Sequence, residues 1–445
     1  MIEPTDNTSP NVGGEASRRQ FITAAGAVAV AAAATASPKT AIASHMPTTA
    51  AGMKRVIGAN DRIHVGHIGP HWNGQGGVHT RYILQHKEDW NIEYAAIADI
   101  YTVHLAHAQQ HIGLPDNRAF IDYREMLDKV PEIDVVWVTT PEHWHFAHAS
   151  AAMEMGKHVY CEKPLCKGVE EALKMHETAL RTGVVFQMGV QASSDPTYKY
   201  IGDQLATGKY GPIVWSQGSY CRNSTDGEWN YYPLDAEATP ENTHWKVFEE
   251  PCHHKHEFDK QRFFRWRKFW SYSAGINGDL WPHVLTPIMI AMGKLEYPRK
   301  VVSTGDLLIQ KDREVPDTVH QIIEYPSGFT MILAGSTTND HGLTPTIRTH
   351  LATIEFAMFG GGQVHIMPQG IAADQLDEVN LHVPGAMESI EKHEHNFLEC
   401  VRNPKLVPNC NIEIATKVQV ALSMGEMAYR QNKEILFDPE KKRLI

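Results

Sequence analysis

The chain has 445 residues, of which 42% are hydrophobic and 21% charged, as in an ordinary globular protein. At this length two domains plus an appendage are expected, and beyond the amino-terminal segment no apolar run is long enough to cross a bilayer, which excludes an integral membrane protein. The formal net charge of -11, with no block of basic residues, excludes the electrostatic footprint of a nucleic-acid-binding protein.

The amino-terminal segment has the parts of a twin-arginine export signal. A polar leader precedes Ser17-Arg18-Arg19-Gln20-Phe21-Ile22, an alanine-rich stretch follows to Ala36, and Ala41-Ile42-Ala43 forms a small-x-small end. The alternatives are a disordered leader or a short interfacial helix. We expect residues 1–43 to be an export signal that delivers the protein to the periplasm, and the fold prediction therefore starts after it.

A Rossmann domain is predicted over residues 60–190. It begins with an alternating β-branched run, Ile63-His64-Val65-Gly66-His67-Ile68-Gly69, which is typical of a buried first strand. Gly74 and Gly76 then precede a helical stretch, and glycines at that place let the backbone turn tightly and approach a pyrophosphate at the helix start. We expect Gly69, Gly74 and Gly76 to form a dinucleotide cradle. The spacing departs from the usual G-x-G-x-x-G, so a glycine-rich surface loop is the alternative.

The second predicted strand indicates which dinucleotide is used. It covers residues 92–98 and ends in Asp99, where the dinucleotide fold needs an acid to bind the ribose hydroxyls. Because an acid repels a 2′-phosphate, NAD is favoured and NADP stays open as the second cofactor.

The rest of this domain repeats a strand and helix order. The run at residues 134–140 is nearly all apolar, as a central parallel strand should be, and it stops at Pro141. Further strands are expected at residues 158–161 and 184–189, with helices at residues 146–155 and 169–182. Right-handed crossovers wind such a β-α-β series into one doubly wound parallel sheet.

A second α/β domain, residues 191–385, is predicted to contain one large, mainly antiparallel sheet. Its alternating runs lie at residues 213–220, 300–305, 318–325, 330–336 and 353–360. Helical periodicity at residues 387–401 and 414–431 fills the carboxyl-terminal segment, residues 386–445.

A segment of the second domain is rich in aromatic and basic side chains. Aromatic faces pack on the C–H surfaces of sugars while arginine binds hydroxyls, so we expect a carbohydrate or polyol pocket with Arg222, Trp245 and Arg265 as contacts. The alternative is that these aromatics only cover the sheet edge. Cys252 and the histidines after it could suggest zinc or copper, but adjacent loop side chains cannot readily all face one ion, so no metal is expected.

Three motifs carry a resemblance to a known family. They are Thr140-Pro141-Glu142-His143-Trp144-His145, Gly156-Lys157-His158-Val159-Tyr160-Cys161-Glu162-Lys163-Pro164-Leu165 and Gly278-Asp279-Leu280-Trp281-Pro282-His283. From Arg62 to its carboxyl terminus the chain resembles the glucose-fructose oxidoreductase, inositol dehydrogenase and rhizopine catabolism (Gfo/Idh/MocA) family. The resemblance implies an NAD(P)-dependent oxidoreductase whose carboxyl-terminal helices brace the Rossmann domain, and a homo-oligomer in which the second sheet packs against another subunit.

By matching position, the resemblance implies that Lys163 lies beside the nicotinamide and the reacting hydroxyl, and that Asp279 and His283 face it from the second domain. Its motifs imply further cofactor contacts at Thr140, Pro141, His145, Glu162, Lys163 and Gln191. Two positions depart from the family: Thr286 stands where an aspartate commonly follows the histidine, and Ser193 stands where many members carry an arginine. The aspartate that usually orients the catalytic imidazole is therefore absent from position 286.

The residue types at this site suit hydride transfer. Taking hydride from a carbinol carbon requires loss of the hydroxyl proton, so a base and a cation are needed together. His283 can take a proton because imidazole titrates near about pH 6.5, and Lys163 can stabilise the developing alkoxide and share the proton work. Asp279, four residues before His283, could orient it or bind a substrate hydroxyl. The alternatives are a core histidine and a solvated lysine.

Three functions remain open from the sequence. The leading one is an exported dehydrogenase of a sugar or polyol, or a reductase of a keto-sugar. The second is an NAD-dependent glycosidase that acts by transient oxidation and elimination and recycles its cofactor every turnover. The third is a nucleotide-bound sensor or scaffold, which the intact Lys163, Asp279 and His283 disfavour.

Overall fold

The computed structural model describes residues 58, 61–357 and 362–445. The predicted export signal, residues 1–43, lies outside the described residues. Within the described ranges, no helix is both long and apolar enough to span a membrane.

Six parallel strands form the first sheet. They are β1 (Ile63–Ile68), β2 (Ile92–Ala98), β3 (Ala119–Phe120), β4 (Val135–Val138), β5 (His158–Glu162) and β6 (Phe186–Gly189). Their order is β3-β2-β1-β4-β5-β6, so the winding direction reverses between β1 and β4. This confirms the predicted doubly wound Rossmann sheet, whose ligands bind at the carboxyl ends of the strands beside that reversal.

Helices cover both faces of this sheet. They are α1 (Gln75–Gln85), α2 (Thr102–Ile112), α3 (Tyr123–Lys129), α4 (His145–Glu154), α5 (Val169–Thr182) and, from the far end of the chain, α11 (Ile390–Arg402). On one face Ile83 of α1 and Phe397 of α11 share a buried cluster with the strands, and on the other face Met126 of α3, Ala149 of α4 and Met175 of α5 do so. All four residues of β4 are buried, as expected for a central strand with helices on both sides.

Ten strands form the second sheet. They are β7 (Ile213–Cys221), β8 (Lys300–Asp306), β9 (Thr318–Glu324), β10 (Thr330–Ser336), β11 (Thr346–Thr349), β12 (Ala352–Phe356), β13 (Gln363–Pro368), β14 (Val379–His382), β15 (Ile435–Asp438) and β16 (Arg443–Leu444). The order is β14-β13-β12-β11-β7-β10-β9-β8-β15-β16, and among these pairs only β7 and β10 run parallel. The large, mainly antiparallel sheet is thus confirmed.

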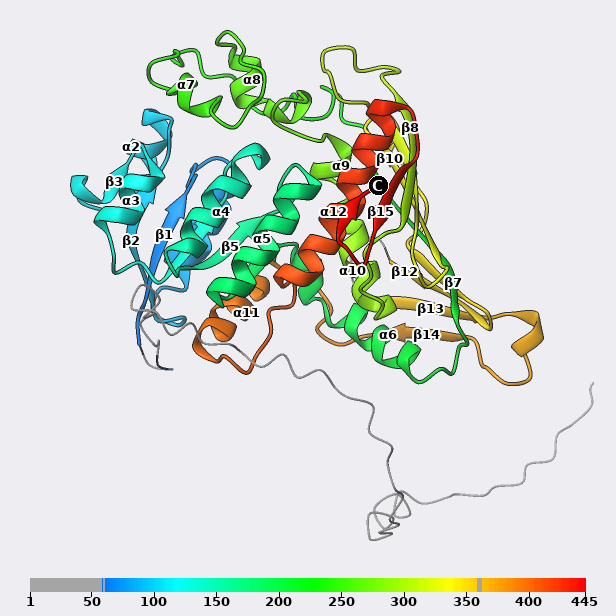
Figure 1. The fold of residues 1–445 in the computed structure, drawn as a ribbon. Coiled ribbons are helices and arrows are strands. Elements are labelled where there is room, and N and C mark those ends of the chain that lie inside the picture. Colours follow the sequence, from blue (N-terminus) through cyan, green and yellow to red (C-terminus); the bar gives the residue numbers. More distant parts are fainter. Residues whose placement is uncertain (1–57, 59–60, 358–361) are drawn as a thin grey trace, which may run out of the picture. The chain divides into compact units, whose positions relative to one another are not determined.

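One face of the second sheet is covered by helices α6 (Pro196–Ala206), α10 (Pro282–Met292) and α12 (Ile412–Gln431), as Figure 1 shows. The approach of α10 is close, because a Cβ at Gly218 of β7 would lie 2.4 Å from Val284. Helix α12 also packs against α5, so the carboxyl-terminal part of the chain joins the two sheets.

Residues 222–275, here called the bridge segment, connect β7 to α9 (Ile276–Asp279) and contact the Rossmann domain. The bridge segment contains α7 (Trp245–Phe248), which lies near α2 in Figure 1, and α8 (Lys260–Phe264), whose Phe264 ring has its centroid 6.3 Å from that of His104 in α2. The N–H of Thr102 donates to the carbonyl of Asn242 at 3.0 Å, and His244 Nδ1 lies 2.7 Å from the carbonyl oxygen of Ile100. These contacts hold the bridge segment on the turn between β2 and α2.

Candidate active site

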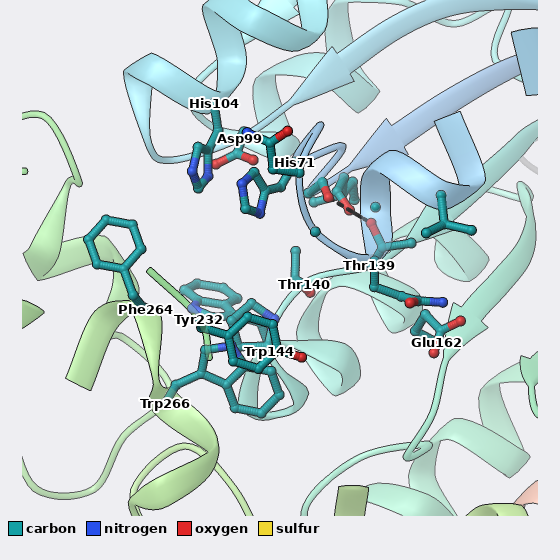
Figure 2. A pocket seen from close by; sticks show the side chains of 18 of the residues that line it. His71, Asp99, His104, Thr139, Thr140, Trp144, Glu162, Tyr232, Phe264 and Trp266 are labelled. Carbon is teal, nitrogen blue, oxygen red and sulfur yellow. Dashed lines mark hydrogen bonds between the residues drawn. The ribbon is translucent and has the colours of Figure 1, made fainter. Parts of the chain in front are cut away.

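A cavity of about 870 Å³ opens at the carboxyl ends of the Rossmann strands. Gly69 follows β1, Asp99 follows β2, Thr140 follows β4 and Glu162 ends β5, and all four line the cavity. Figure 2 shows Tyr232, from the bridge segment, in the same cavity. The cavity therefore lies where a doubly wound sheet binds its nucleotide, and both domains contribute to its wall.

The loop between β1 and α1 is too tightly packed for side chains at its glycines. A Cβ at Gly76 would lie 2.1 Å from the carbonyl oxygen of Gly69, and a Cβ at Gly77 would lie 1.9 Å from that of Trp72. Gly69 has a φ of 84°, in the left-handed region that favours glycine. Gly74 caps α1 without a side-chain hydrogen bond, and its carbonyl accepts the N–H of Gly77 at 3.0 Å, which leaves the N–H groups of Gln75 and Gly76 to a ligand. This cradle fits the diphosphate of a dinucleotide.

Asp99 marks the end of the cavity expected to hold the ribose. Its carboxylate accepts a hydrogen bond from the N–H of Tyr101 at 2.9 Å, and burial raises its pKa to about 7. The rings of His71 and His104 stack beside it with centroids 3.6 Å apart (Figure 2). Burial lowers their pKa values to about 4 and about 2, so both imidazoles are neutral at pH 7. This end of the cavity therefore suits uncharged ribose hydroxyls.

Lys163 and Asp279 meet across the two domains. Lys163 Nζ lies 2.7 Å from Asp279 Oδ1 and 2.7 Å from the Asp279 carbonyl oxygen. The same carboxylate accepts from Arg267 Nε at 2.9 Å and from Trp229 Nε1 at 2.8 Å. Burial alone would raise the pKa of Asp279, but the ammonium of Lys163 and the guanidinium of Arg267 hold that pKa well below its usual range. Asp279 is thus a fixed anion that positions two cations at the cavity.

His283 lies in the first turn of α10 and lines the same cavity. Its Nδ1 is 3.8 Å from Oε1 of Glu388, which also lines the cavity, and its ring centroid is 6.0 Å from that of Tyr220. Thr286, where the family commonly has an aspartate, is fully buried, and its hydroxyl has no hydrogen-bond partner in the described part of the chain. The acid facing His283 therefore comes from another element, just before α11.

The predicted cofactor residues are almost all brought to the cavity. Those that line it are Gly69, Gly74, Gly76, Asp99, Thr140, Pro141, Glu162, Lys163 and Gln191. His145 does not line it: its ring nitrogens each lie 2.7 Å from a carbonyl oxygen, one of Pro164 and one of Thr140. It fastens the loops after β4 and β5 to each other.

The three predicted substrate contacts separate in the structure. Arg222 lines the cavity, where Nη1 bonds Glu228 at 2.9 Å. Trp245 lies away from it in an aromatic cluster, with Nε1 donating to a backbone carbonyl at 2.8 Å. Arg265 also lies outside the lining and donates to the carbonyl of Tyr232 at 2.9 Å.

Sequence reasoning missed several residues that line or support the site. Arg267 faces the cavity two positions from Arg265, with its guanidinium carbon 4.1 Å from the ring centroid of Trp266. Trp229 lies within the aromatic-rich stretch, but the pattern did not show which aromatic would bond Asp279. Glu388 has no motif around it. Among the described residues, no three His, Cys, Asp or Glu side chains gather as a metal site would require.

Two sequence models of one family match the chain. The model described as "Oxidoreductase family, NAD-binding Rossmann fold" matches residues 63–190, and that described as "Oxidoreductase family, C-terminal alpha/beta domain" matches residues 222–445. These matches confirm the predicted family and its dinucleotide, NAD.

Individual curated proteins match only part of the chain, at low sequence identity. An uncharacterized oxidoreductase of Rhizobium meliloti is 35% identical over 137 residues, which are 30% of this chain and 40% of that protein. A glycosyl hydrolase family 109 protein of a Shewanella species is 28% identical over 239 residues, 51% of this chain and 50% of that protein. The chain thus spans half or less of the length of these curated relatives.

A solved structure shows the same fold over nearly the whole described chain. An inositol dehydrogenase homolog from Azotobacter vinelandii, complexed with NADH and myo-inositol, matches with a TM-score of 0.64 at 18% identity. The match covers 87% of this chain and 100% of that one. Taken with the two family models, these findings show that the chain belongs to the Gfo/Idh/MocA oxidoreductase family, with an NAD-binding Rossmann domain followed by the family's carboxyl-terminal α/β domain.

Proposed function

We propose that this protein is an NAD-dependent oxidoreductase that transfers hydride between the cofactor and a CH–OH carbon of a sugar, a polyol or the corresponding keto-sugar. The observation that carries the proposal is the pairing of Lys163 with Asp279 at 2.7 Å, from two domains, in a cavity that His283 also lines. The Azotobacter structure supports the substrate class, since that homolog is complexed with NADH and myo-inositol.

The nicotinamide, when bound, supplies the hydride acceptor or donor. The ammonium of Lys163 donates a hydrogen bond to the substrate oxygen and stabilises the negative charge that develops there. His283 exchanges the hydroxyl proton: a proton on Nδ1, facing Glu388, leaves Nε2 as the basic nitrogen. Asp279 keeps Lys163 in place and stays ionised throughout, because its neighbouring cations stabilise the carboxylate.

The test is the absorbance of reduced nicotinamide when the protein is mixed with NAD and a panel of sugars and polyols. With a responsive substrate, Lys163→Met should lower kcat by about 10²–10⁴ while NAD binding, measured by calorimetry, persists. Lys167→Met is the matched control, because that lysine lies outside the cavity lining and bonds the carbonyl of Trp270. A Lys163→Met protein as active as the Lys167→Met protein would contradict the proposal.

A second candidate is an NAD-dependent glycosidase that oxidises its substrate transiently, eliminates the aglycone and returns the hydride. The glycosyl hydrolase family 109 relatives favour it. Both activities begin with the same hydride step, so the same residues serve either. An aryl glycoside distinguishes them: the glycosidase releases the phenol over many turnovers with no net reduced cofactor, whereas the dehydrogenase accumulates reduced cofactor in proportion to product.

Export through the twin-arginine route is proposed from Arg18-Arg19 and the segment around them. We expect the double variant Arg18→Lys/Arg19→Lys to stay in the cytoplasm, which cell fractionation would measure. Equal periplasmic amounts of both proteins would contradict this localisation.

A homo-oligomer that uses the second sheet is also proposed. Val302, Ile322 and Ile332 stand opposite one another on β8, β9 and β10, on the face away from α10, and Ile322 is 42% exposed. A second copy would bury this apolar row. Ile322→Glu should lower the mass measured by light scattering, and a parent protein that is already monomeric would contradict the assembly.

A further inference from the structure

Three ionisable side chains, Glu394, His79 and Glu162, form a buried row that ends at the cavity. Glu394 of α11 lies with Oε1 at 2.7 Å from His79 Nδ1, and His79 of α1 lies with Nε2 at 2.9 Å from Oε1 of Glu162. The side chains of His79 and Glu394 are 0% exposed, while Glu162 reaches the cavity wall, where Figure 2 shows it. Three elements far apart in sequence therefore meet at one imidazole.

The two contacts determine how many protons the imidazole carries. A neutral imidazole has one donor and one acceptor nitrogen, so it cannot donate to acceptors on both sides. With both carboxylates ionised, each ring nitrogen of His79 must carry hydrogen. Burial alone would lower the pKa of His79, but the negative charges of Glu394 and Glu162 raise it to about 10.

The same contacts keep Glu162 ionised. Burial alone would raise its pKa, but His79 and then Lys163 lower it to about 2. The other oxygen of Glu162 accepts the N–H of Lys163 at 3.2 Å, and Trp137 Nε1 donates to Glu394 at 2.9 Å. Further titratable groups that interact electrostatically with the three side chains are His67, Tyr94, His145, Tyr160, Cys161, Lys163, His283 and His393.

We propose that His79 and Glu394 are positioning residues that hold Glu162 as a permanent carboxylate at the cavity wall, so that the proton from the substrate hydroxyl stays on Lys163 or His283 and is not passed to Glu162. This inference rests on the proposed hydride transfer. In that step the C–H electron pair leaves with the hydride, the O–H bond breaks, and its proton ends on one of these two bases. A carboxylate that cannot be protonated stabilises the base in its protonated form.

The protonation of His79 can be measured without turnover. In protein labelled with ¹⁵N at histidine, we expect the imidazole of His79 to keep both ring protons at pH 9, where ordinary histidines are neutral. The signal should vanish in His79→Gln and persist in His67→Gln, the matched control: His67 is equally buried but lies 3.1 Å from the hydroxyl of Tyr94 and 2.9 Å from that of Thr139. If every imidazole of the unsubstituted protein has lost a proton by pH 9, the proposal is overturned.

The ionisation of Glu162 gives the second readout. In His79→Gln burial remains while the cation is lost, so Glu162 should take up a proton at mildly acidic pH. Infrared spectra should then show a new protonated carboxyl that disappears in His79→Gln/Glu162→Gln. The kcat/KM of His79→Gln should fall more steeply with falling pH than that of the parent or of His67→Gln, because protonation of Glu162 adds to the protonation of the catalytic base that all three proteins share.

Each outcome decides one claim. Absence of the new carboxyl signal in a folded His79→Gln protein would overturn the proposal, and if this variant fails to fold, the nitrogen spectrum of the unsubstituted protein decides it. Failure of the proposed function is seen separately, as no nicotinamide-dependent oxidation of any substrate, and it leaves both spectroscopic results unaffected.

Discussion

Replacing Asp279 by asparagine keeps the shape of the side chain and removes one negative charge. The lost carboxylate accepts from Lys163 at 2.7 Å, from Arg267 at 2.9 Å and from Trp229 at 2.8 Å. The lysine and arginine side chains are only 13% and 16% exposed, so both cations would remain largely buried without their counter-ion. Removing one partner of a buried ion pair costs about 3–5 kcal/mol, and we expect the free energy of unfolding to fall by about that amount at pH 7.

The effect has a defined pH dependence. The pKa of Asp279 is held well below its usual range by Lys163 and Arg267, against the effect of burial. A folded pKa below the unfolded one means that the stabilisation is complete above about pH 4 and is lost as the pH falls through the lower folded value. The difference between parent and Asp279→Asn should therefore be constant near neutral pH and shrink in acid.

Urea unfolding followed by circular dichroism measures both quantities. Asp195→Asn is the matched control: Asp195 is also buried, but its carboxylate caps α6 by accepting the N–H of Thr197 at 2.8 Å. Asparagine caps helices as well as aspartate does, so a change below about 0.5 kcal/mol is expected there. An Asp279→Asn protein that is no less stable at pH 7 than the Asp195→Asn protein would refute the counter-ion role.

Gly76→Ala should abolish NAD binding in calorimetry, because the added Cβ would stand 2.1 Å from the Gly69 carbonyl oxygen; an affinity within about tenfold of the parent would count against the cradle. Glu388→Leu should lower kcat of the proposed reaction and change KM little, since the carboxylate lies 3.8 Å from His283. The loss of kcat should be smaller than the about 10²–10⁴-fold that positioned proton transfer contributes, and Glu388→Asp should retain more activity than Glu388→Leu. Equal kcat in the parent and both variants would exclude a role of Glu388 in positioning His283. Burial alone would lower the pKa of His79, but its two carboxylate neighbours raise that pKa to about 10. The charged imidazole therefore stabilises the folded protein fully below about pH 6.5, and this stabilisation is lost as the pH rises towards 10. Melting temperatures between pH 6 and pH 10 should therefore fall more steeply for the parent than for His79→Gln, and parallel curves would argue against a charged His79.

The fold was predictable because its signals are local. The run that stops at Pro141 is apolar, as a strand buried on both faces must be, and an alternating β-branched run that stops at Gly69 marks the first strand. Alternating runs mark the second sheet, because helices cover only one of its faces and the side chains of a strand point to the two faces in turn. Sequence reasoning passed over β3, β11, β13, β14, β15 and β16. All of these except β13 have only two to four residues, which is too short for an alternating run to stand out.

The site was predictable only where a motif names the residue. Lys163, Asp279 and His283 belong to motifs, and they line one cavity. Their partners depend on tertiary packing: Arg267 and Trp229 come from the bridge segment, whose aromatic and basic composition does not show which side chains face inward. Composition pointed equally to Trp245 and Arg265, which the fold uses to pack the bridge segment.

The pairing of His79 with Glu394 spans 315 positions of the chain. During synthesis the ribosome completes the whole Rossmann sheet long before it makes α11. Until then His79 has no Glu394, and the imidazole in a nascent domain lacks one of the two carboxylates that keep it charged. The cavity thus acquires its working electrostatics only once α11 has docked, and a chain truncated before α11 would lack both Glu394 and the Phe397 side chain that packs on the Rossmann strands.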